Sequence, residues 1–531
     1  CTGITSIKFH DQVTSIGYAS FQQCSGLTNT LTLPDTIISL GQYAFAECSS
    51  IKSIVFSSEL TSLADHAFEL CTGLSGTLTI PENIGSVGKY TFSSCSSINA
   101  LNLSDHLISI DQYAFSYCTS IRGNLSLPNS ITTINNYAFR GCTSITEFNY
   151  PSDINTLGDG VFRNCTSLRG TVTFTENINT IPNYFFADCT TISNISFHDS
   201  IKIISPYAFY NCSSLRGPLE FPETLTSIQT GAFRLCTSLR GPLEFPDKFT
   251  TIQKLAFSNC TSLGTSLSFP ESVTTIGERA FEYCTGFTGT LTLNKTLTEV
   301  GSYVFSCCSG FTKLVLLDGI TKISEGCFNR CSGLSGSLDF PDTIDVIGKS
   351  AFCRCTGFKG SLNLPTTYMS LIDSYAFDRC SGFTGGLNIS YVEKLNEGAF
   401  YKCSGFNALT LCKRLLEIPN FAFYQCTGLT GEILFPSVLT DVGSYAFYEC
   451  SKLKGSIYFS DNLNTVGDYA FYKCSNFDGT LTLGARIGYI GKCSFFECSR
   501  LKGSLEIRNS SYFKSDENYE NGKRNTKLCI I

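Results

Sequence analysis

The chain of 531 residues contains no tryptophan, one methionine and four histidines, and only 15% of its residues are charged. The net charge of −6 at pH 7 disfavours a nucleic-acid partner, because binding to a phosphate backbone requires a basic stripe. No apolar run approaches the roughly 18 consecutive residues of a membrane span. Both nucleic-acid-binding and membrane-spanning classes are therefore disfavoured for this segment.

Cysteine, in contrast, is abundant and regularly spaced. The chain has 28 cysteines, and 22 of them, from Cys1, Cys24 and Cys48 on to Cys498, are separated by 23 or 24 residues and once by 25. We call these 22 residues the marker cysteines. A period of this length over nearly the whole chain is typical of a solenoid, in which each turn buries its apolar face against its neighbours. From Cys1 to Cys236 the intervals alternate between 23 and 24 residues, which indicates duplication of a two-turn unit of 47 residues.

The segment 118–140 illustrates how one turn is expected to fold. Leu125 and Leu127 alternate with a polar residue, which is the period of a half-buried strand, and Pro128 ends that strand because it lacks a backbone donor. Phe139 stands three residues before the next marker, as a phenylalanine does in nearly every turn. We predict an α/β-type, β-rich repeat solenoid: a parallel leucine-rich repeat solenoid of about 21–22 turns of 23–24 residues, with phenylalanine and cysteine ladders inside.

The array is expected to be one domain over 1–508, followed by a tail over 509–531. The tail is polar and reads as a disordered linker. The only methionine, Met369, lies inside the array, so the lack of a signal peptide says nothing about secretion. A hydrophobic membrane anchor beyond Ile531 is one expectation.

The motif Tyr-Ala-Phe-x-x-Cys, followed by Ser or Thr, recurs along the array, for example at 113–119 and 445–451. With its leucine-rich strand and Pro, the pattern resembles the BspA-like leucine-rich repeat family, a type abundant in surface antigens of oral bacteria and parasitic protists. The resemblance covers about 1–508. It implies a leucine-rich solenoid displayed at a cell surface and associated with adhesion to host matrix or to other cells, and it implies no catalytic residues.

The marker cysteines leave two interpretations open, buried thiols and a disulfide or metal framework. One cysteine per turn lacks the paired spacing of a zinc site, and cysteine is among the most often buried residues, so buried thiols are favoured. A disulfide near 307–355 is the alternative for part of the remaining six, which are Cys307, Cys327, Cys353, Cys412, Cys493 and Cys529.

No catalytic residue, cofactor, metal site or small-molecule substrate is predicted. Nothing in the sequence pairs any histidine with a nucleophile, and distance along a rod keeps most of them apart. The four histidines are His10, His66, His106 and His198.

The outward position of the first strand forms a column of mainly Thr, Ser and Asn, with Glu220 and Glu244 among them. Like charges on neighbouring strands repel, so neutral residues are explained by sheet stability alone. The alternative is a broad polar surface that binds a protein or glycan and includes Glu220 and Glu244.

A second column stands out immediately after the core phenylalanine. Five consecutive turns place an aromatic residue there, and earlier turns place polar residues, so the position is expected to be exposed. Because Tyr is enriched in protein interfaces, the column predicts a docking site; the alternative is that the rings merely stack and shield the turn. We call it the aromatic strip: Tyr401, Tyr424, Tyr448, Tyr472 and Phe496.

Six Asn-x-Ser/Thr sequons are candidate glycosylation sites, in a secretory context only. They are Asn102, Asn124, Asn194, Asn294, Asn388 and Asn509.

These observations predict a non-enzymatic adhesion or interaction protein at a cell surface or outside the cell. Its partner would be a protein or glycan on a host cell, in the matrix or on a neighbouring cell. The alternative is a cytoplasmic leucine-rich repeat scaffold for protein–protein interaction. Cysteine usage does not separate the two, because reduced thiols fit both the cytosol and an anaerobic exterior.

Overall fold

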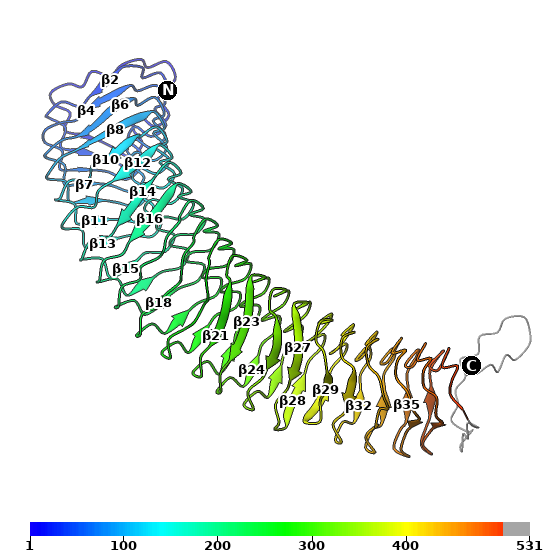
Figure 1. Ribbon diagram of the computed structural model, residues 1–531. Coiled ribbons are helices and arrows are strands. Elements are labelled where there is room, and N and C mark those ends of the chain that lie inside the picture. The colour runs from blue at the N-terminus through cyan, green and yellow to red at the C-terminus, as the bar shows by residue number, and fades with distance from the viewer. Residues whose placement is uncertain (503–531) are drawn as a thin grey trace, which may run out of the picture. The chain divides into compact units, whose positions relative to one another are not determined.

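The computed structural model describes residues 1–502. The predicted tail 509–531, the sequon at Asn509 and Cys529 therefore lie outside the described residues. The chain divides into two compact units, which we call unit 1 (Cys1–Leu263) and unit 2 (Gly264–Ile531). Each unit is a parallel β-solenoid, with about 21 turns in all, which confirms the predicted fold (Figure 1). A single domain over 1–508 stays a prediction.

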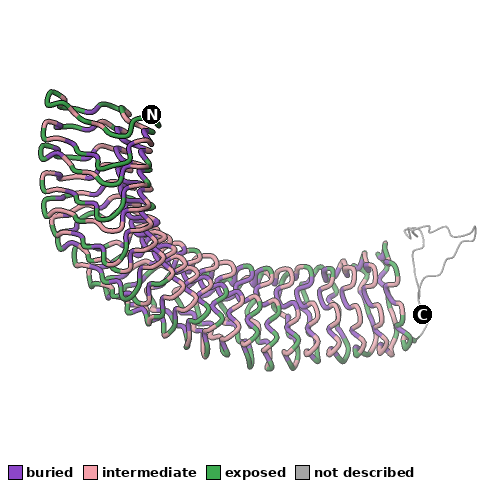
Figure 2. Tube along the Cα trace, turned by 90° about the horizontal axis from the view of Figure 1, so that it is seen from above, coloured by how far each residue is buried: buried purple, intermediate pink, exposed green. Residues whose placement is uncertain are grey.

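The turn that begins at Cys118 shows how the sequence builds this fold. Strand β10 (Gly123–Leu125) carries Leu125, which is 3% exposed, and Leu127 beyond it is 2% exposed. Strand β11 (Thr133–Ile134) carries a fully buried isoleucine, and Phe139 is also fully buried. The predicted inward positions are confirmed, and buried residues recur in the turns throughout both units (Figure 2).

The first strands of the turns pair in parallel twos, so this face is a series of two-stranded ribbons. Each ribbon spans two consecutive turns, and in unit 1 this agrees with the two-turn unit inferred from the cysteine spacing. In unit 1 the pairs are β2 (Thr30–Thr32) with β4 (Ser53–Val55), β6 (Gly76–Ile80) with β8 (Ile98–Leu103), β10 with β12 (Ile145–Phe148), and β14 (Gly170–Thr173) with β16 (Ile192–Ser196). In unit 2 they are β21 (Gly289–Leu293) with β23 (Phe311–Leu316), β25 (Gly336–Asp339) with β27 (Phe358–Asn363), β29 (Gly386–Asn388) with β31 (Ala408–Thr410), and β34 (Ile457–Tyr458) with β36 (Leu481–Thr482).

The second strands are mostly two residues long and form longer parallel ladders. In unit 1 they are β1 (Ser15–Ile16), β3 (Ser39–Leu40), β5 (Ser62–Leu63), β7 (Ser86–Val87), β9 (Ser109–Ile110), β11, β13 (Thr156–Leu157), β15 (Thr180–Ile181), β17 (Ile203–Ile204), β18 (Ser227–Ile228) and β19 (Thr251–Ile252). In unit 2 they are β20 (Thr275–Ile276), β22 (Glu299–Val300), β24 (Lys322–Ile323), β26 (Val346–Ile347), β28 (Met369–Ile372), β30 (Val392–Leu395), β32 (Glu417–Ile418), β33 (Asp441–Val442), β35 (Thr465–Val466) and β37 (Tyr489–Ile490).

Consecutive tight turns, and no helix, complete each repeat within residues 1–502. In these tight turns, backbone hydrogen bonds within one turn alternate with hydrogen bonds to the next turn. The amide of Ala114 donates to the carbonyl of Asp111 in its own turn (3.2 Å), whereas the amide of Phe115 donates to the carbonyl of Ala138 in the next turn (2.9 Å). The alternation places left-handed residues two positions before the core phenylalanine, such as Tyr113 at φ 58°, and again just before the marker. A residue with positive φ interrupts a right-handed helix. Where the sequence predicted an α/β-type repeat, the turns of residues 1–502 therefore consist of β-strands and tight turns.

A phenylalanine stack fills the core. The rings of Phe45 and Phe68 have centroids 5.6 Å apart and lie 3° from parallel, and Phe377 and Phe400 are 5.4 Å apart and 1° from parallel. All four are fully buried. Their repeated contact, one per turn, explains why phenylalanine recurs at this position.

The marker cysteines are buried, apart from Cys1, which confirms the favoured interpretation. From Cys48 on, nearly every marker thiol donates to the carbonyl of the core phenylalanine of the preceding turn, as Cys142 does to Phe115 (3.2 Å) and Cys403 to Phe377 (2.9 Å). Burial raises the pKa of the Cys118 thiol to about 12, so it stays protonated and able to donate.

The proposed alternative of a disulfide near 307–355 is not realised. Cys307 and Cys353 are both half-buried free thiols. The Cys353 thiol instead donates to Asp378 (3.3 Å).

Candidate interaction surfaces

The aromatic strip in unit 2 is half-buried rather than exposed as predicted. Its rings stack face to face along the solenoid: Tyr401 and Tyr424 are 4.6 Å apart, Tyr424 and Tyr448 4.8 Å, Tyr448 and Tyr472 4.8 Å, and Tyr472 and Phe496 5.3 Å. Stacking covers the ring faces, so the strip presents ring edges and hydroxyl groups to solvent. The five residues are brought together as expected; their role in binding stays a prediction.

A second aromatic column, which sequence reasoning missed, flanks the strip. Phe421 and Tyr445 stack at 5.0 Å, and so do Tyr445 and Tyr469. Ring contacts join the two columns: Tyr445 and Tyr448 are tilted at 5.7 Å, and Tyr469 meets Tyr472 edge to face at 5.6 Å. The recurring Tyr of the Tyr-Ala-Phe motif was the available signal. We call the strip and this column together the aromatic block.

Charged and polar side chains border the aromatic block. The ammonium group of Lys402 lies 5.4 Å from the ring centroid of Tyr401, and that of Lys473 lies 5.3 Å from Tyr472. Gln425 donates to Glu449 (2.6 Å). Burial among its neighbours raises the pKa of Tyr424 to about 12, so its hydroxyl group remains a hydrogen-bond donor at physiological pH.

A comparable ladder in unit 1 also escaped sequence reasoning. It consists of Tyr43, His66, Tyr90, Tyr113 and Tyr137, with successive ring centroids 4.3, 4.7, 4.7 and 4.9 Å apart. These rings occupy the left-handed position two residues before each core phenylalanine. We call this set the unit 1 ladder.

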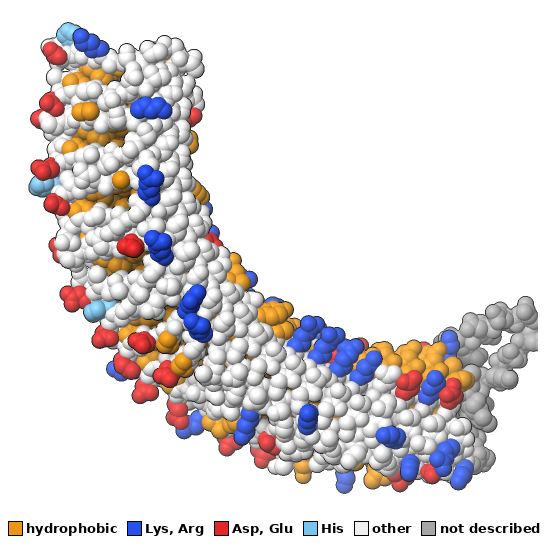
Figure 3. Space-filling view, turned by 45° about the horizontal axis from the view of Figure 1, so that its top comes forward, with side chains coloured by type: hydrophobic (Ala, Val, Ile, Leu, Met, Phe, Trp, Pro, Cys, Tyr) orange, Lys and Arg blue, Asp and Glu red, His pale blue; other side chains and the backbone are white. Residues whose placement is uncertain are grey.

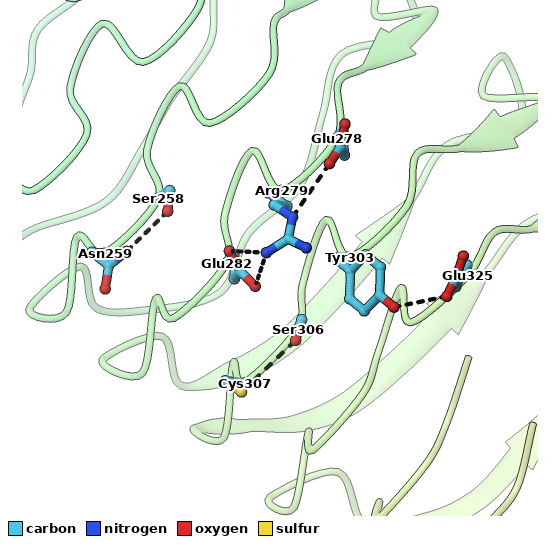
Figure 4. A network of polar contacts seen from close by, with 9 residues as sticks. All are labelled: Ser258, Asn259, Glu278, Arg279, Glu282, Tyr303, Ser306, Cys307 and Glu325. Atoms are coloured by element: carbon cyan, nitrogen blue, oxygen red, sulfur yellow. Dashed lines mark hydrogen bonds and ion pairs between the residues drawn. The ribbon is translucent and has the colours of Figure 1, made fainter. Parts of the chain in front are cut away.

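Unit 2 shows that the same position accepts a cation. Arg279 occupies it, and its guanidinium group lies 4.8 Å from the ring centroid of Tyr303 in the next turn (Figure 4). Glu282 accepts from Arg279 at 3.1 Å, and the hydroxyl group of Tyr303 donates to Glu325 at 2.8 Å. At this position, two residues before the core phenylalanine, a cation–π contact and charged hydrogen bonds can therefore replace the stacking of two aromatic rings.

The structure places Glu220 and Glu244 side by side on the strand face of unit 1. Both are exposed, and the residues before them, Leu219 and Leu243, form a parallel bridge. Glu220 also lines a hollow of about 660 Å³ beside β16, together with Arg216 and Phe221. Their predicted role in partner binding remains a prediction.

Among the sequons, Asn102, Asn124, Asn194 and Asn388 are exposed. Asn294 is 5% exposed, and its amide nitrogen donates to the carbonyl of Pro270 at 2.5 Å. This burial argues against glycosylation at Asn294, because the amide nitrogen that would carry the glycan is already bonded inside the turn. Modification of the exposed four stays a prediction.

Residues 1–502 contain no group of three or more His, Cys, Asp or Glu side chains that could hold a metal ion. Over the same part of the chain, no helix is both long and apolar enough to cross a membrane.

Several solved structures of leucine-rich repeat proteins are similar to this chain. Among solved structures, a leucine-rich repeat protein from Bacteroides ovatus is 21% identical, with 81% of this chain and 87% of that chain covered and a TM-score of 0.38. A leucine rich cell surface protein from Faecalibacterium prausnitzii is 18% identical, with 59% and 86% covered and a TM-score of 0.34. The pneumococcal vaccine antigen PcpA is 15% identical, with 83% and 90% covered and a TM-score of 0.24.

Sequence comparison gives a match at the level of a family model. A search of the curated proteins finds no match. A model of the BspA type leucine rich repeat region matches in six copies, at 1–122, 86–216, 217–335, 264–384, 335–454 and 370–502. The copies overlap or adjoin, so together they span all the described residues.

Proposed function

The chain belongs to the family of BspA type leucine rich repeat proteins, and we propose that it is a non-enzymatic adhesion protein that binds a protein partner through the aromatic block. The proposal places it at a cell surface, with its partner on a host cell, in the matrix or on a neighbouring cell. Proteins of this family are repeat scaffolds for interaction.

The observation that carries the proposal is the composition of the aromatic block and its border. Half-buried rings form a continuous apolar centre, and Lys402, Lys473 and Glu449 stand beside it. An apolar centre with a polar rim, enriched in Tyr, is the usual make-up of a protein interface. Four steps between stacked rings give the strip a length of about 20 Å, which is within the reach of one partner domain.

The double substitution Tyr424→Ala with Tyr448→Ala tests the proposal. We expect binding to host cells or to immobilised matrix proteins to weaken by more than about 1 kcal/mol, a factor of roughly five, because buried tyrosines dominate binding at such centres. The inward Phe423 and Phe447 remain, so the solenoid should stay folded, as circular dichroism would check.

Tyr90→Ala with Tyr113→Ala in the unit 1 ladder is the matched control. It removes the same two side chains from an equivalent stack and should cost a similar amount of stability, about 1 kcal/mol for each ring contact, without loss of binding. Equal binding by the folded unit 2 variant and the wild type would refute the role of the aromatic block.

Surface display has a separate test. Antibodies against this chain should stain intact source cells as strongly as permeabilised ones. Staining only after permeabilisation would favour the cytoplasmic scaffold.

A further inference from the structure

A column of cations runs along unit 1 at the position four residues after each marker cysteine. Its neutral members include Thr146 and Ser193, and none of its members in unit 1 is acidic. We define the cation column by its charged members: Lys52, Arg122, Arg169, Arg216 and Arg240.

Backbone hydrogen bonds hold this column in register. The amide of Arg169 donates to the carbonyl of Thr146 at 3.0 Å, and the amide of Arg240 donates to that of Arg216 at 2.9 Å. The position therefore advances by one turn, about 4.8 Å, at each step. The three central arginines, Arg122, Arg169 and Arg216, stand two turns apart, which spaces their backbone positions about 10 Å from each other.

All five cations are exposed. Within residues 1–502 none of them has an ion pair, a side-chain hydrogen bond or a ring contact, unlike Arg163, which pairs with Asp188 at 3.8 Å. Figure 3 shows Lys and Arg side chains in a row on unit 1, with Asp and Glu gathered along another margin. Unpaired, aligned guanidinium groups are available to an external anion.

Most acids of unit 1 lie away from the column position; the exceptions are Glu147 beside it, and Glu220 and Glu244, each four residues after a column arginine. Exposed carboxylates such as Glu82, Asp199 and Glu223 follow the first strand of their turns, seven residues or so beyond the column position. Seven extended residues span roughly 20 Å, about two Debye lengths at physiological salt. The column position itself therefore carries only positive charge, although the chain as a whole is acidic. Glu147 is the nearest acid along the chain, one residue after Thr146.

We propose that the cation column binds an anionic polysaccharide laid along the axis of unit 1. The acidic groups of such a polymer are carried on separate sugars, which matches Arg122, Arg169 and Arg216 at two-turn intervals. Duplex DNA carries a charge about every 1.7 Å, a density that cations about 10 Å apart neutralise poorly. The inference extends the proposed adhesion function and rests on it, but it uses a surface of unit 1 and not the aromatic block.

The test is binding of the whole chain to immobilised heparin, a sulfated polysaccharide, at low salt. The triple variant Arg122→Ser, Arg169→Ser, Arg216→Ser should bind at least tenfold more weakly and with a smaller dependence on salt. Serine already occupies this column at Ser75 and Ser193, so the change fits the fold. The matched control, Lys89→Ser, Lys202→Ser, Lys248→Ser, removes three exposed cations from other columns and should bind as the wild type does.

Glu147→Gln provides an independent check that does not depend on the triple variant. Removing this carboxylate should tighten binding to heparin about two- to fivefold. Equal losses of heparin binding in the triple variant and its control would show that only the net charge matters and would overturn the proposal. Unchanged heparin binding by the triple variant would also overturn it. Desulfated heparin bound as tightly as heparin, or an oligonucleotide duplex bound more tightly, would also overturn it. Loss of cell adhesion in the aromatic block variant with heparin binding intact would separate the two surfaces.

Discussion

At the scale of the residue, the marker cysteine is a small, buried, mainly apolar side chain whose thiol also donates one hydrogen bond. The carbonyl of Phe115 accepts the amide of Cys118 in its own turn at 3.3 Å and the thiol of Cys142 in the next turn at 3.2 Å. A backbone carbonyl has two lone pairs, and both are used inside the core. The thiol thus links consecutive turns where no water can substitute for it.

Cys142→Ala should lower the free energy of unfolding by about 1–2 kcal/mol, because it removes the bond to Phe115 and leaves a void the size of the sulfur atom. Cys142→Ser should retain part of the bond. Cys307→Ala, at a half-buried thiol, is the control and should change stability by less than about 0.5 kcal/mol. Thermal melts followed by circular dichroism measure all three, and equal shifts at Cys142 and Cys307 would contradict the role assigned to the core thiol.

At the scale of the element, the tight-turn side of each repeat depends on left-handed residues. Gly398 occupies one such position at φ 60°, and a Cβ built there would collide with the ring of Tyr375 from the preceding turn. Gly385 is also left-handed, at φ 83°, but a Cβ there would meet no atom within 4 Å. The two glycines therefore separate backbone strain from side-chain collision.

Gly385→Ala should destabilise unit 2 by about 1 kcal/mol through strain alone. Gly398→Ala should cost about 1–3 kcal/mol more, because the Tyr375 ring has to leave its position. The comparison needs only the melting temperatures of the two variants. Equal losses would show that the ring moves aside freely and that the stacking beside Gly398 is soft.

At the scale of the whole molecule, each turn contacts mainly the turns before and after it, so stability is close to a sum of turns and their interfaces. The sequence Ser-Leu-Arg-Gly-Pro-Leu-Glu-Phe-Pro occurs at both 214–222 and 238–246, one turn apart in unit 1. Deleting the 24 residues from one copy to the equivalent point of the other removes one turn and leaves this nine-residue sequence unchanged at the join.

Deletion of 215–238 should give a folded protein with an unchanged circular dichroism spectrum per residue and a melting temperature within a few degrees of the wild type. Deletion of 215–226, half a turn, should give an unfolded or aggregated unit 1, because every later strand would face the wrong wall. Size-exclusion chromatography and circular dichroism distinguish the outcomes. Similar behaviour of the two deletions would contradict the nearest-neighbour description.

Four features could be predicted from the sequence alone: the solenoid, the inward leucines such as Leu125, the phenylalanine stack and the burial of the marker thiols. These features follow from the period, because stacking equivalent turns gives each position of the repeat the same neighbours in every turn. The family resemblance is likewise a property of the recurring motif.

The accessibility of the surface side chains, in contrast, became known only from the folded chain. Tyr424 and Tyr448 are half-buried because their rings stack across turns, Tyr445 joins them through a left-handed backbone, and Asn294 is held inside by Pro270. The exposure of a side chain on the turn surface depends on backbone φ and on rotamers one turn away, and the repeat period specifies neither.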